Sequence, residues 1–141
     1  MALDTLKVEL LSPRKVVSKA EATAVTIPGL LGYMKLLPGH APLIAELGVG
    51  ELSVEKRDGW EKYFVSGGFL EIEENSVKLL VDVIERPTEI DKERVLRSKA
   101  RADGRLTSKE NAVDISRALD AAKRADARLA FLESVANQRM A

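Results

Sequence analysis

The strongest constraint on the fold of this chain is the distribution of its prolines and glycines. All five prolines and eight of the nine glycines lie at or before Pro87, and the exception is Gly104. Because proline interrupts a helix and glycine weakens one, residues 1–87 are not expected to form long helices. Residues 88–141 lack such interruptions apart from Gly104. The change predicts two structural units, residues 1–87 and residues 88–141.

Charge divides at the same point, although the whole chain is neutral. The chain has 22 basic and 22 acidic side chains. Residues 1–87 hold 10 basic and 13 acidic groups, a net charge of −3, whereas residues 88–141 hold 12 and 9, a net charge of +3. A zero total argues against a protein held to nucleic acid mainly by phosphate contacts. We therefore expect no nucleic-acid partner.

The residue types that most often carry catalysis are scarce. The chain has no cysteine and one histidine, His40. Without cysteine the chain cannot form a zinc-thiolate site. A single histidine makes a Ser-His-Asp triad improbable and is too few for a multi-histidine metal site. A P-loop and a nucleophile elbow are also missing. We predict no catalytic residue, no metal ligand and no required cofactor, with His40 as a structural residue in a proline-flanked loop.

Residues 1–87 alternate apolar and polar side chains at period two, as strands do. Examples are Leu6, Val8 and Leu10, and a last strand with Val77, Leu79, Val81 and Val83 on one face. Turn signals stand at 57–59, 66–68 and 73–76. Glycine and proline punctuate the run every eight to twelve residues or so. The pattern predicts an all-β sandwich of about ten short strands.

Residues 88–141 have the pattern of an antiparallel two-helix hairpin. Thr88 is the predicted N-cap of a first helix that runs to about Ala102 and stops at Asp103-Gly104. Residues 106–111 are the predicted connection, and a second helix is expected from about 112 to 137. Apolar residues at heptad-like spacing form the predicted seam of this second helix: Ala118, Ala122, Ala125, Leu129, Leu132 and Ala136. Alanine buries little area, so we expect the hairpin to be weakly held.

Arginines recur on one face of each predicted helix. Those of the first helix are Arg94, Arg97, Arg101 and Arg105, and those of the second are Arg117, Arg124 and Arg128. Such rows are usually solvated faces with i,i+4 partners, such as Asp120 with Arg124. Two rows that flank one groove would instead bind a polyanion, because guanidinium groups match phosphate oxygens. Both interpretations remain open from spacing alone.

Two further stretches carry a family resemblance. Residues 36–43, Leu-Leu-Pro-Gly-His-Ala-Pro-Leu, and residues 64–71, Phe-Val-Ser-Gly-Gly-Phe-Leu-Glu, resemble the paired signature of the epsilon subunit of F-type ATP synthases of the bacterial and chloroplast type. The similarity runs along the whole chain. It implies an N-terminal β-sandwich and a C-terminal helix-turn-helix, as the residue pattern also predicts.

The resemblance implies a non-catalytic central-stalk rotor subunit of the proton-translocating ATP synthase. In the family the sandwich binds the gamma subunit and the membrane-embedded c-ring, and helps to couple proton flow to ATP synthesis. The helical hairpin folds down or extends along gamma towards the alpha and beta subunits, where it inhibits ATP hydrolysis. The implied location is peripheral, at the cytoplasmic face of the bacterial inner membrane rather than the stromal face of the thylakoid.

Some bacterial members bind ATP as a regulatory ligand in the folded hairpin, through a motif I/L-D-x-x-R-A and further arginines. The positions that match are Ile90, Asp91, Arg94, Arg101, Arg124 and Arg128, with Glu85 at an acidic position before the hairpin. Val95 departs from the motif's alanine, and its larger side chain would crowd the base or loosen the site.

Two alternatives stand beside the nucleotide-sensing rotor subunit. One is a structural rotor adaptor that does not sense nucleotide, which Val95 favours. The other is a stand-alone β-sandwich binding module whose basic hairpin grips an acidic protein or nucleic acid.

Overall fold

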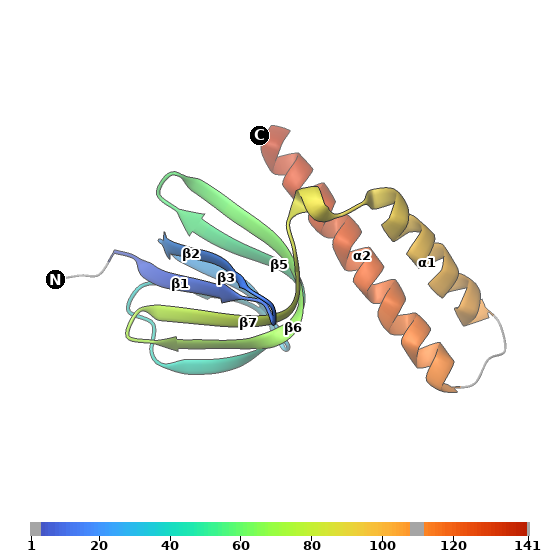
Figure 1. Ribbon diagram of the computed structural model, residues 1–141, viewed down its shortest axis with the longest axis horizontal. Coiled ribbons are helices and arrows are strands. Elements are labelled where there is room, and N and C mark those ends of the chain that lie inside the picture. Colours follow the sequence, from blue (N-terminus) through green and yellow to red (C-terminus); the bar gives the residue numbers. More distant parts are fainter. Residues whose placement is uncertain (1–3, 108–111, 141) are drawn as a thin grey trace. The chain divides into compact units, whose positions relative to one another are not determined.

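The computed structural model describes residues 4–107 and 112–140, which form seven strands and two α-helices (Figure 1). They belong to two compact units that divide between Arg86 and Pro87. The strands all lie in the first unit: β1 (Leu6–Leu11), β2 (Val16–Ala22), β3 (Ala24–Gly29), β4 (Gly32–Leu36), β5 (Leu43–Lys56), β6 (Gly59–Glu73) and β7 (Ser76–Glu85).

One hydrogen-bonded sheet of order β2-β1-β7-β6-β5-β3-β4 makes up the sandwich. All neighbours are antiparallel except β1 and β7, which are parallel. The strands β5 and β6 have 14 and 15 residues, and they pair with each other along nearly their whole length. Beside one half of this pair the sheet continues through β7, β1 and β2, and beside the other half it continues through β3 and β4. The predicted sandwich is therefore confirmed, but the predicted count of about ten strands is too high.

The two long strands rotate about their own axes at glycines near their middle. On β6 the inward-facing side chains are Tyr63 and Val65 before this point, and Leu70 and Ile72 after it. The inward positions thus change from odd to even, which requires a local rotation of the strand. Gly67 supplies it with φ of 76°, a left-handed conformation that glycine adopts without a side-chain clash. The predicted turn at 66–68 is therefore wrong, because these residues rotate one continuous strand about its axis and do not reverse the chain.

The same rotation corrects the expected face of β7. Val77, Leu79 and Val81 are buried as predicted, but Val83 is 40% exposed. Val83 pairs with Ser66 and Ile84 pairs with Val65, both beyond the rotation in β6. Ile84 consequently packs against the core where Val83 was expected. The predicted turns at 57–59 and 73–76 are confirmed.

Glu61 of β6 ties the free edge strand β2 to the opposite layer. Its carboxylate accepts hydrogen bonds from the Ser18 hydroxyl at 3.1 Å, the Tyr63 hydroxyl at 3.0 Å and Lys56 Nζ at 2.9 Å. Because Ser18 lies on β2 and Lys56 on β5, three strands meet at one half-buried carboxylate. Burial raises the pKa of Glu61, but the three hydrogen bonds outweigh it and leave the pKa below its ordinary value.

The second unit consists of a 3₁₀ turn η1 (Pro87–Glu89), α1 (Lys92–Thr107) and α2 (Ala112–Met140). The N-cap of α1 is Asp91, not Thr88: Asp91 Oδ1 accepts from Arg94 N at 3.3 Å, and its carbonyl accepts from Val95 N at 3.0 Å. Thr88 instead lies within η1, where Ile90 N donates to the Pro87 carbonyl.

The helix α1 passes through the predicted stop at Asp103-Gly104. A single glycine costs a helix only about 1 kcal/mol, and good helix formers such as Arg101 and Leu106 flank it. The rest of the predicted connection, residues 108–111, lies outside the described residues. The helix α2 extends three residues beyond its predicted end at 137.

The two helices pack antiparallel along a seam of small residues. Val95 and Ala102 of α1 are buried, as are Ala118, Ala122 and Ala125 of α2. Leu129 and Leu132 are half-buried, but Ala136 is exposed and is wrongly predicted to belong to the seam. The Lys99–Asp126 ion pair, at 2.7 Å, marks the register, which places Lys92 opposite about residue 133. Ala136 therefore lies beyond the start of α1.

We predict that Gly68→Ala destabilises the sandwich far more than Gly32→Ala. Both glycines have positive φ, 127° and 138°, so either alanine incurs backbone strain of about 1–3 kcal/mol. A Cβ at Gly68 would also meet the Leu80 carbonyl oxygen and the Val81 Cα, whereas one at Gly32 meets nothing within 4 Å. Urea unfolding followed by the fluorescence of Trp60, the single tryptophan, measures both. Equal destabilisation would contradict the close approach of β6 and β7.

We predict that Glu61→Gln removes part of the acid sensitivity of the sandwich. The ordinary pKa is 4.5 and the folded pKa is lower, so the stabilisation is complete above about pH 4.5 and is lost as pH falls through the folded pKa. Trp60-detected urea unfolding across the acid range should show a flatter profile for Glu61→Gln than for the native chain. The exposed Glu73→Gln is the control and should keep the native slope.

Candidate functional site

The helical phase of the hairpin gives it two chemically different sides. Lys99 of α1 and Asp126 of α2 meet at 2.7 Å and mark one side. A helix turns 100° per residue. Lys99 is therefore rotated about the axis of α1 from Ala102 in the same direction as Asp126 is rotated about the axis of α2 from Ala125. In an antiparallel pair, the positions with the opposite rotational sense must share the other side.

That other side carries arginines of both helices, but not Arg97 of the predicted row, which the helical phase places on the face opposite the seam. On α1, Arg94, Arg101 and Arg105 lie beside the seam formed by Val95 and Ala102, on the side of the seam opposite Lys99. On α2, Arg117, Arg124 and Arg128 take the equivalent positions relative to Ala118 and Ala125. We name these six the arginine side: Arg94, Arg101, Arg105, Arg117, Arg124 and Arg128.

Exposure differs within the arginine side. Arg94, Arg101, Arg105 and Arg117 are exposed, whereas Arg124 and Arg128 are half-buried beside the seam. Arg101 donates to the Ser98 hydroxyl at 3.3 Å. Among the described side chains, the predicted Asp120–Arg124 ion pair does not form. The guanidinium of Arg124 is therefore not neutralised by its own helix, as a solvated i,i+4 pair would require.

The remaining predicted site residues have different places. Asp91 caps α1 through its carboxylate, so it has a structural role whatever else it binds. Ile90 is half-buried between η1 and α1. Glu85 is the last residue of β7 and belongs to the sandwich unit, whereas the other six predicted residues belong to the hairpin unit.

Val95 lies in the seam rather than on the arginine side. Its side chain is 8% exposed and shares the seam face with Ala102, seven residues on. Reasoning from the motif alone treats Val95 only as a neighbour of a bound base. The i,i+7 spacing to Ala102 is the signal that indicates a packing role.

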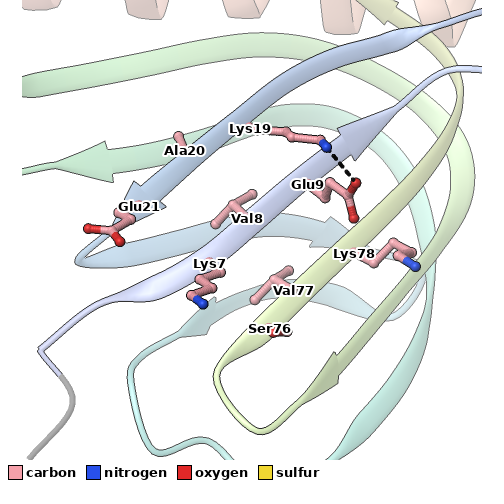
Figure 2. Close-up of a pocket in the computed structure, with 9 residues that line it drawn as sticks. All are labelled: Lys7, Val8, Glu9, Lys19, Ala20, Glu21, Ser76, Val77 and Lys78. Atoms are coloured by element: carbon pink, nitrogen blue, oxygen red, sulfur yellow. Dashed lines mark ion pairs between the residues drawn. The ribbon is translucent and has the colours of Figure 1, made fainter.

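A groove on the outer surface of the sandwich is lined by charged side chains of both signs. It lies over β1, β2 and β7 and is lined by Lys7, Lys19 and Lys78 together with Glu9 and Glu21 (Figure 2). Lys19 and Glu9 form an ion pair at 3.6 Å. Opposite charges alternate across these strands, so the groove has no strong preference for an ion of one sign.

The loop that contains His40 is held by its own hydrogen bonds. His40 Nδ1 lies 2.6 Å from the Ala41 carbonyl oxygen, and Gly39 N donates to Asn75 Oδ1 at 2.7 Å. Asn75 stands at the β6–β7 turn with φ of 61°. The loop is thereby tied to a neighbouring turn, which fits the predicted structural role of His40.

Two searches of the described residues, 4–107 and 112–140, gave negative results. No group of three or more His, Asp or Glu side chains is placed to hold a metal ion there. Neither helix is long and apolar enough over this part of the chain to cross a membrane.

A seven-stranded sandwich followed by an α-helical hairpin defines a class of small two-unit subunits. The sandwich matches the family model of the ATP synthase delta/epsilon chain β-sandwich domain over residues 5–87. The hairpin matches the long α-helix domain of the same chain over residues 88–133. The protein belongs to the delta/epsilon chain family of ATP synthases, which confirms the resemblance seen in the sequence.

Bacterial relatives carry the name ATP synthase epsilon chain. One from Desulforudis audaxviator is 40% identical over 78% of this chain and 80% of its own length. Another, from Moorella thermoacetica, is 42% identical over 79% of this chain and 84% of its own length. These names denote a non-catalytic subunit of an enzyme complex, as predicted.

Solved structures share the fold at low sequence identity. A chain of the Euglena gracilis mitochondrial ATP synthase has a TM-score of 0.75 and 23% identity, covering 98% of this chain and 83% of that one. A chain of the Tetrahymena thermophila central stalk and c-ring assembly has a TM-score of 0.64 and 13% identity, covering 90% and 96%.

We predict that Val95→Ala loosens the hairpin. The change removes buried apolar area from a seam that is otherwise mostly alanine, at a cost of about 1–2 kcal/mol, partly offset by the better helix propensity of alanine. Amide hydrogen exchange of α1 should speed up while that of β6 is unchanged. Leu96→Ala is the matched control, because Leu96 is 47% exposed on the same helix. Equal effects of the two changes would contradict the seam position of Val95.

Proposed function

We propose that this chain is the epsilon-type rotor subunit in the central stalk of a bacterial ATP synthase. Its family membership and the names of its bacterial relatives support this role. In the proposal the sandwich binds the gamma subunit and the c-ring, and the chain is a peripheral component at the cytoplasmic face of the inner membrane. Through these contacts it helps to couple proton flow to ATP synthesis.

The hairpin is the proposed regulatory element, with ATP as its ligand. The observation that carries this proposal is the arginine side, where rows from both helices flank the same face of the seam. Guanidinium groups are permanently charged and match phosphate oxygens in pairs. A bound triphosphate would relieve the repulsion between the two rows and thereby favour the paired helices.

The proposed switch has two states of the hairpin. ATP stabilises the paired state, by about 2.7 kcal/mol at a hundredfold excess over its dissociation constant. It can shift the equilibrium only through its different affinity for the two states. When ATP falls, the released basic hairpin would extend towards acidic surface on the alpha and beta subunits and inhibit hydrolysis.

A rotor adaptor that does not sense nucleotide is the second candidate. The position of Val95 favours it, because this side chain adds apolar contact to the seam without any ligand. A hairpin that is already stable would respond little to ATP. The family match favours either rotor function over a stand-alone binding module.

We expect ATP to bind the intact chain in isothermal titration calorimetry at low salt. Arg124→Ala should weaken binding by about 1.5–3 kcal/mol, the usual contribution of a charge-assisted hydrogen bond. Lys123→Ala is the matched control: Lys123 is exposed, and the helical phase turns it away from the arginine side. No binding at millimolar ATP would remove the sensor and leave the rotor role. An equal loss in both variants would indicate unspecific attraction between charges.

A further inference from the structure

Two members of the arginine side, Arg105 and Arg117, lie outside the sequence positions that match the ATP motif. Arg105 belongs to the last turn of α1, and Arg117 lies near the start of α2. Both side chains are exposed. The members that do match the motif are Arg94, Arg101, Arg124 and Arg128. The end of the hairpin that carries Arg105 and Arg117 therefore has no role in the proposed binding of ATP.

The antiparallel register sorts the six arginines into three pairs, each with one arginine from each helix. The helices α1 and α2 run side by side (Figure 1), and the ion pair of Lys99 with Asp126 marks residues at the same level along their axes. Two residues further along α1, and two residues back along α2, Arg101 is level with Arg124. The partners in the two outer pairs are offset by about three residues along the axes. The three pairs are Arg94 with Arg128, Arg101 with Arg124, and Arg105 with Arg117.

The three pairs recur at regular intervals along the hairpin. The outer pairs are eleven residues apart on either helix, from Arg94 to Arg105 on α1 and from Arg117 to Arg128 on α2. A helix rises 1.5 Å per residue, so the outer pairs are about 16 Å apart and the central pair is about 8 Å from each. The triphosphate of ATP has only three linked phosphate groups, which span the gap between two neighbouring pairs. The arginine side is therefore longer than this ligand.

The basic side chains of the hairpin are segregated by type. Among the described side chains, the arginine side contains no lysine: Lys92 and Lys99 turn to the opposite side of the seam, and Lys123 turns away from it. Guanidinium groups offer paired hydrogen bonds that fit phosphate oxygens, whereas an ammonium group acts as a point charge. The segregation favours a ligand built of phosphate groups over a general attraction for anions.

The groove between the two rows of arginines is narrow. Buried alanines form the seam beneath it, with Ala102 of α1 facing Ala118 and Ala122 of α2. Helices that pack through small side chains approach to about 8 Å between their axes, the short end of the usual range. A phosphate chain has no side chains and no N–H groups that require partners, so it can lie along such a groove. An acidic peptide would need room for its side chains and partners for its backbone.

We propose that the arginine side binds a linear polyphosphate chain longer than the triphosphate of ATP. The chain runs along the seam and contacts the three pairs in turn, and Arg105 and Arg117 form the subsite that a triphosphate held at the other end does not reach. The proposal deepens the proposed nucleotide site and rests on it for the first two pairs of arginines. ATP and the longer chain consequently compete for Arg101 and Arg124.

The first test compares inorganic triphosphate with linear inorganic hexaphosphate by isothermal titration calorimetry of the intact chain. The native chain should bind hexaphosphate about tenfold or more tightly than triphosphate, as one further pair of charge-assisted contacts provides. The double variant Arg105→Gln, Arg117→Gln should lose this preference and bind triphosphate almost as the native chain does. The matched control, Arg97→Gln with Lys123→Gln, removes the same charge from the same two helices on faces away from the arginine side, and should keep the preference. Circular dichroism checks the helices of each variant.

The second test uses the dependence of binding on salt. Affinity for a polyanion falls more steeply with salt concentration when more of its charges are neutralised. With the native chain and the control variant, hexaphosphate should show a steeper slope than triphosphate. With the Arg105/Arg117 variant the two slopes should be alike. Poly-glutamate should bind weakly, and binding as tight as that of hexaphosphate, lost in the same variant, would assign the surface to an acidic peptide and overturn the polyphosphate site.

The outcomes separate this proposal from the proposed function. If ATP binds but hexaphosphate has no advantage over triphosphate, or if both double variants weaken hexaphosphate binding equally, the additional subsite is wrong and the ATP sensor stands. If hexaphosphate binds through Arg105 and Arg117 and ATP does not bind, the sensor fails and the polyphosphate site stands. If neither ligand binds, both proposals fail. A preference for hexaphosphate that is lost only in the Arg105/Arg117 variant supports the longer site.

Discussion

The rotation of β5 and β6 at their central glycines is the constraint on which the sandwich depends. Gly67 adopts a left-handed conformation, and any Cβ on Gly68 would meet the backbone of β7. This close approach lets two long strands serve both layers, so the core closes without separate connecting turns. It also sets the outward register of β6 and β7, and therefore the position of Phe69 beside Leu80.

The fold class could be predicted because periodicity and turn chemistry are local properties. Asp58-Gly59 and Asn75 indicate their turns directly, since few residues accept the conformations required. The glycines at 67 and 68 could not be interpreted in this way, because a tight turn and a rotated strand favour the same residue. Only the cross-strand register, which is a long-range property, distinguishes the two. The N-cap error at Thr88 has a similar cause, since Asp91 satisfies the same cap chemistry three residues later.

For the hairpin, spacing predicts which face of each helix carries arginine but not how the two faces meet. The missing information is the antiparallel register, which the Lys99–Asp126 pair supplies. That register brings both rows to one side, and it also excludes Ala136 from the seam. The burial of Val95 could not be predicted from the motif for another reason. A motif assigns residues to the binding of a ligand, whereas burial of a side chain depends on the neighbouring helix.

In the proposed switch, Val95 and the arginine side have opposite effects on the hairpin. The apolar contact of Val95 would stabilise the paired helices with or without a ligand, whereas repulsion between the arginine rows would oppose pairing until an anion binds. The balance of these two terms decides whether nucleotide controls the hairpin. If the seam is dominant, the hairpin stays paired and the chain acts as a constant adaptor. If the repulsion is dominant, pairing follows the ATP concentration. Because Val95 lies in the seam and away from the arginines, a change at this position alters the apolar contact between the helices without altering the repulsion between the arginines.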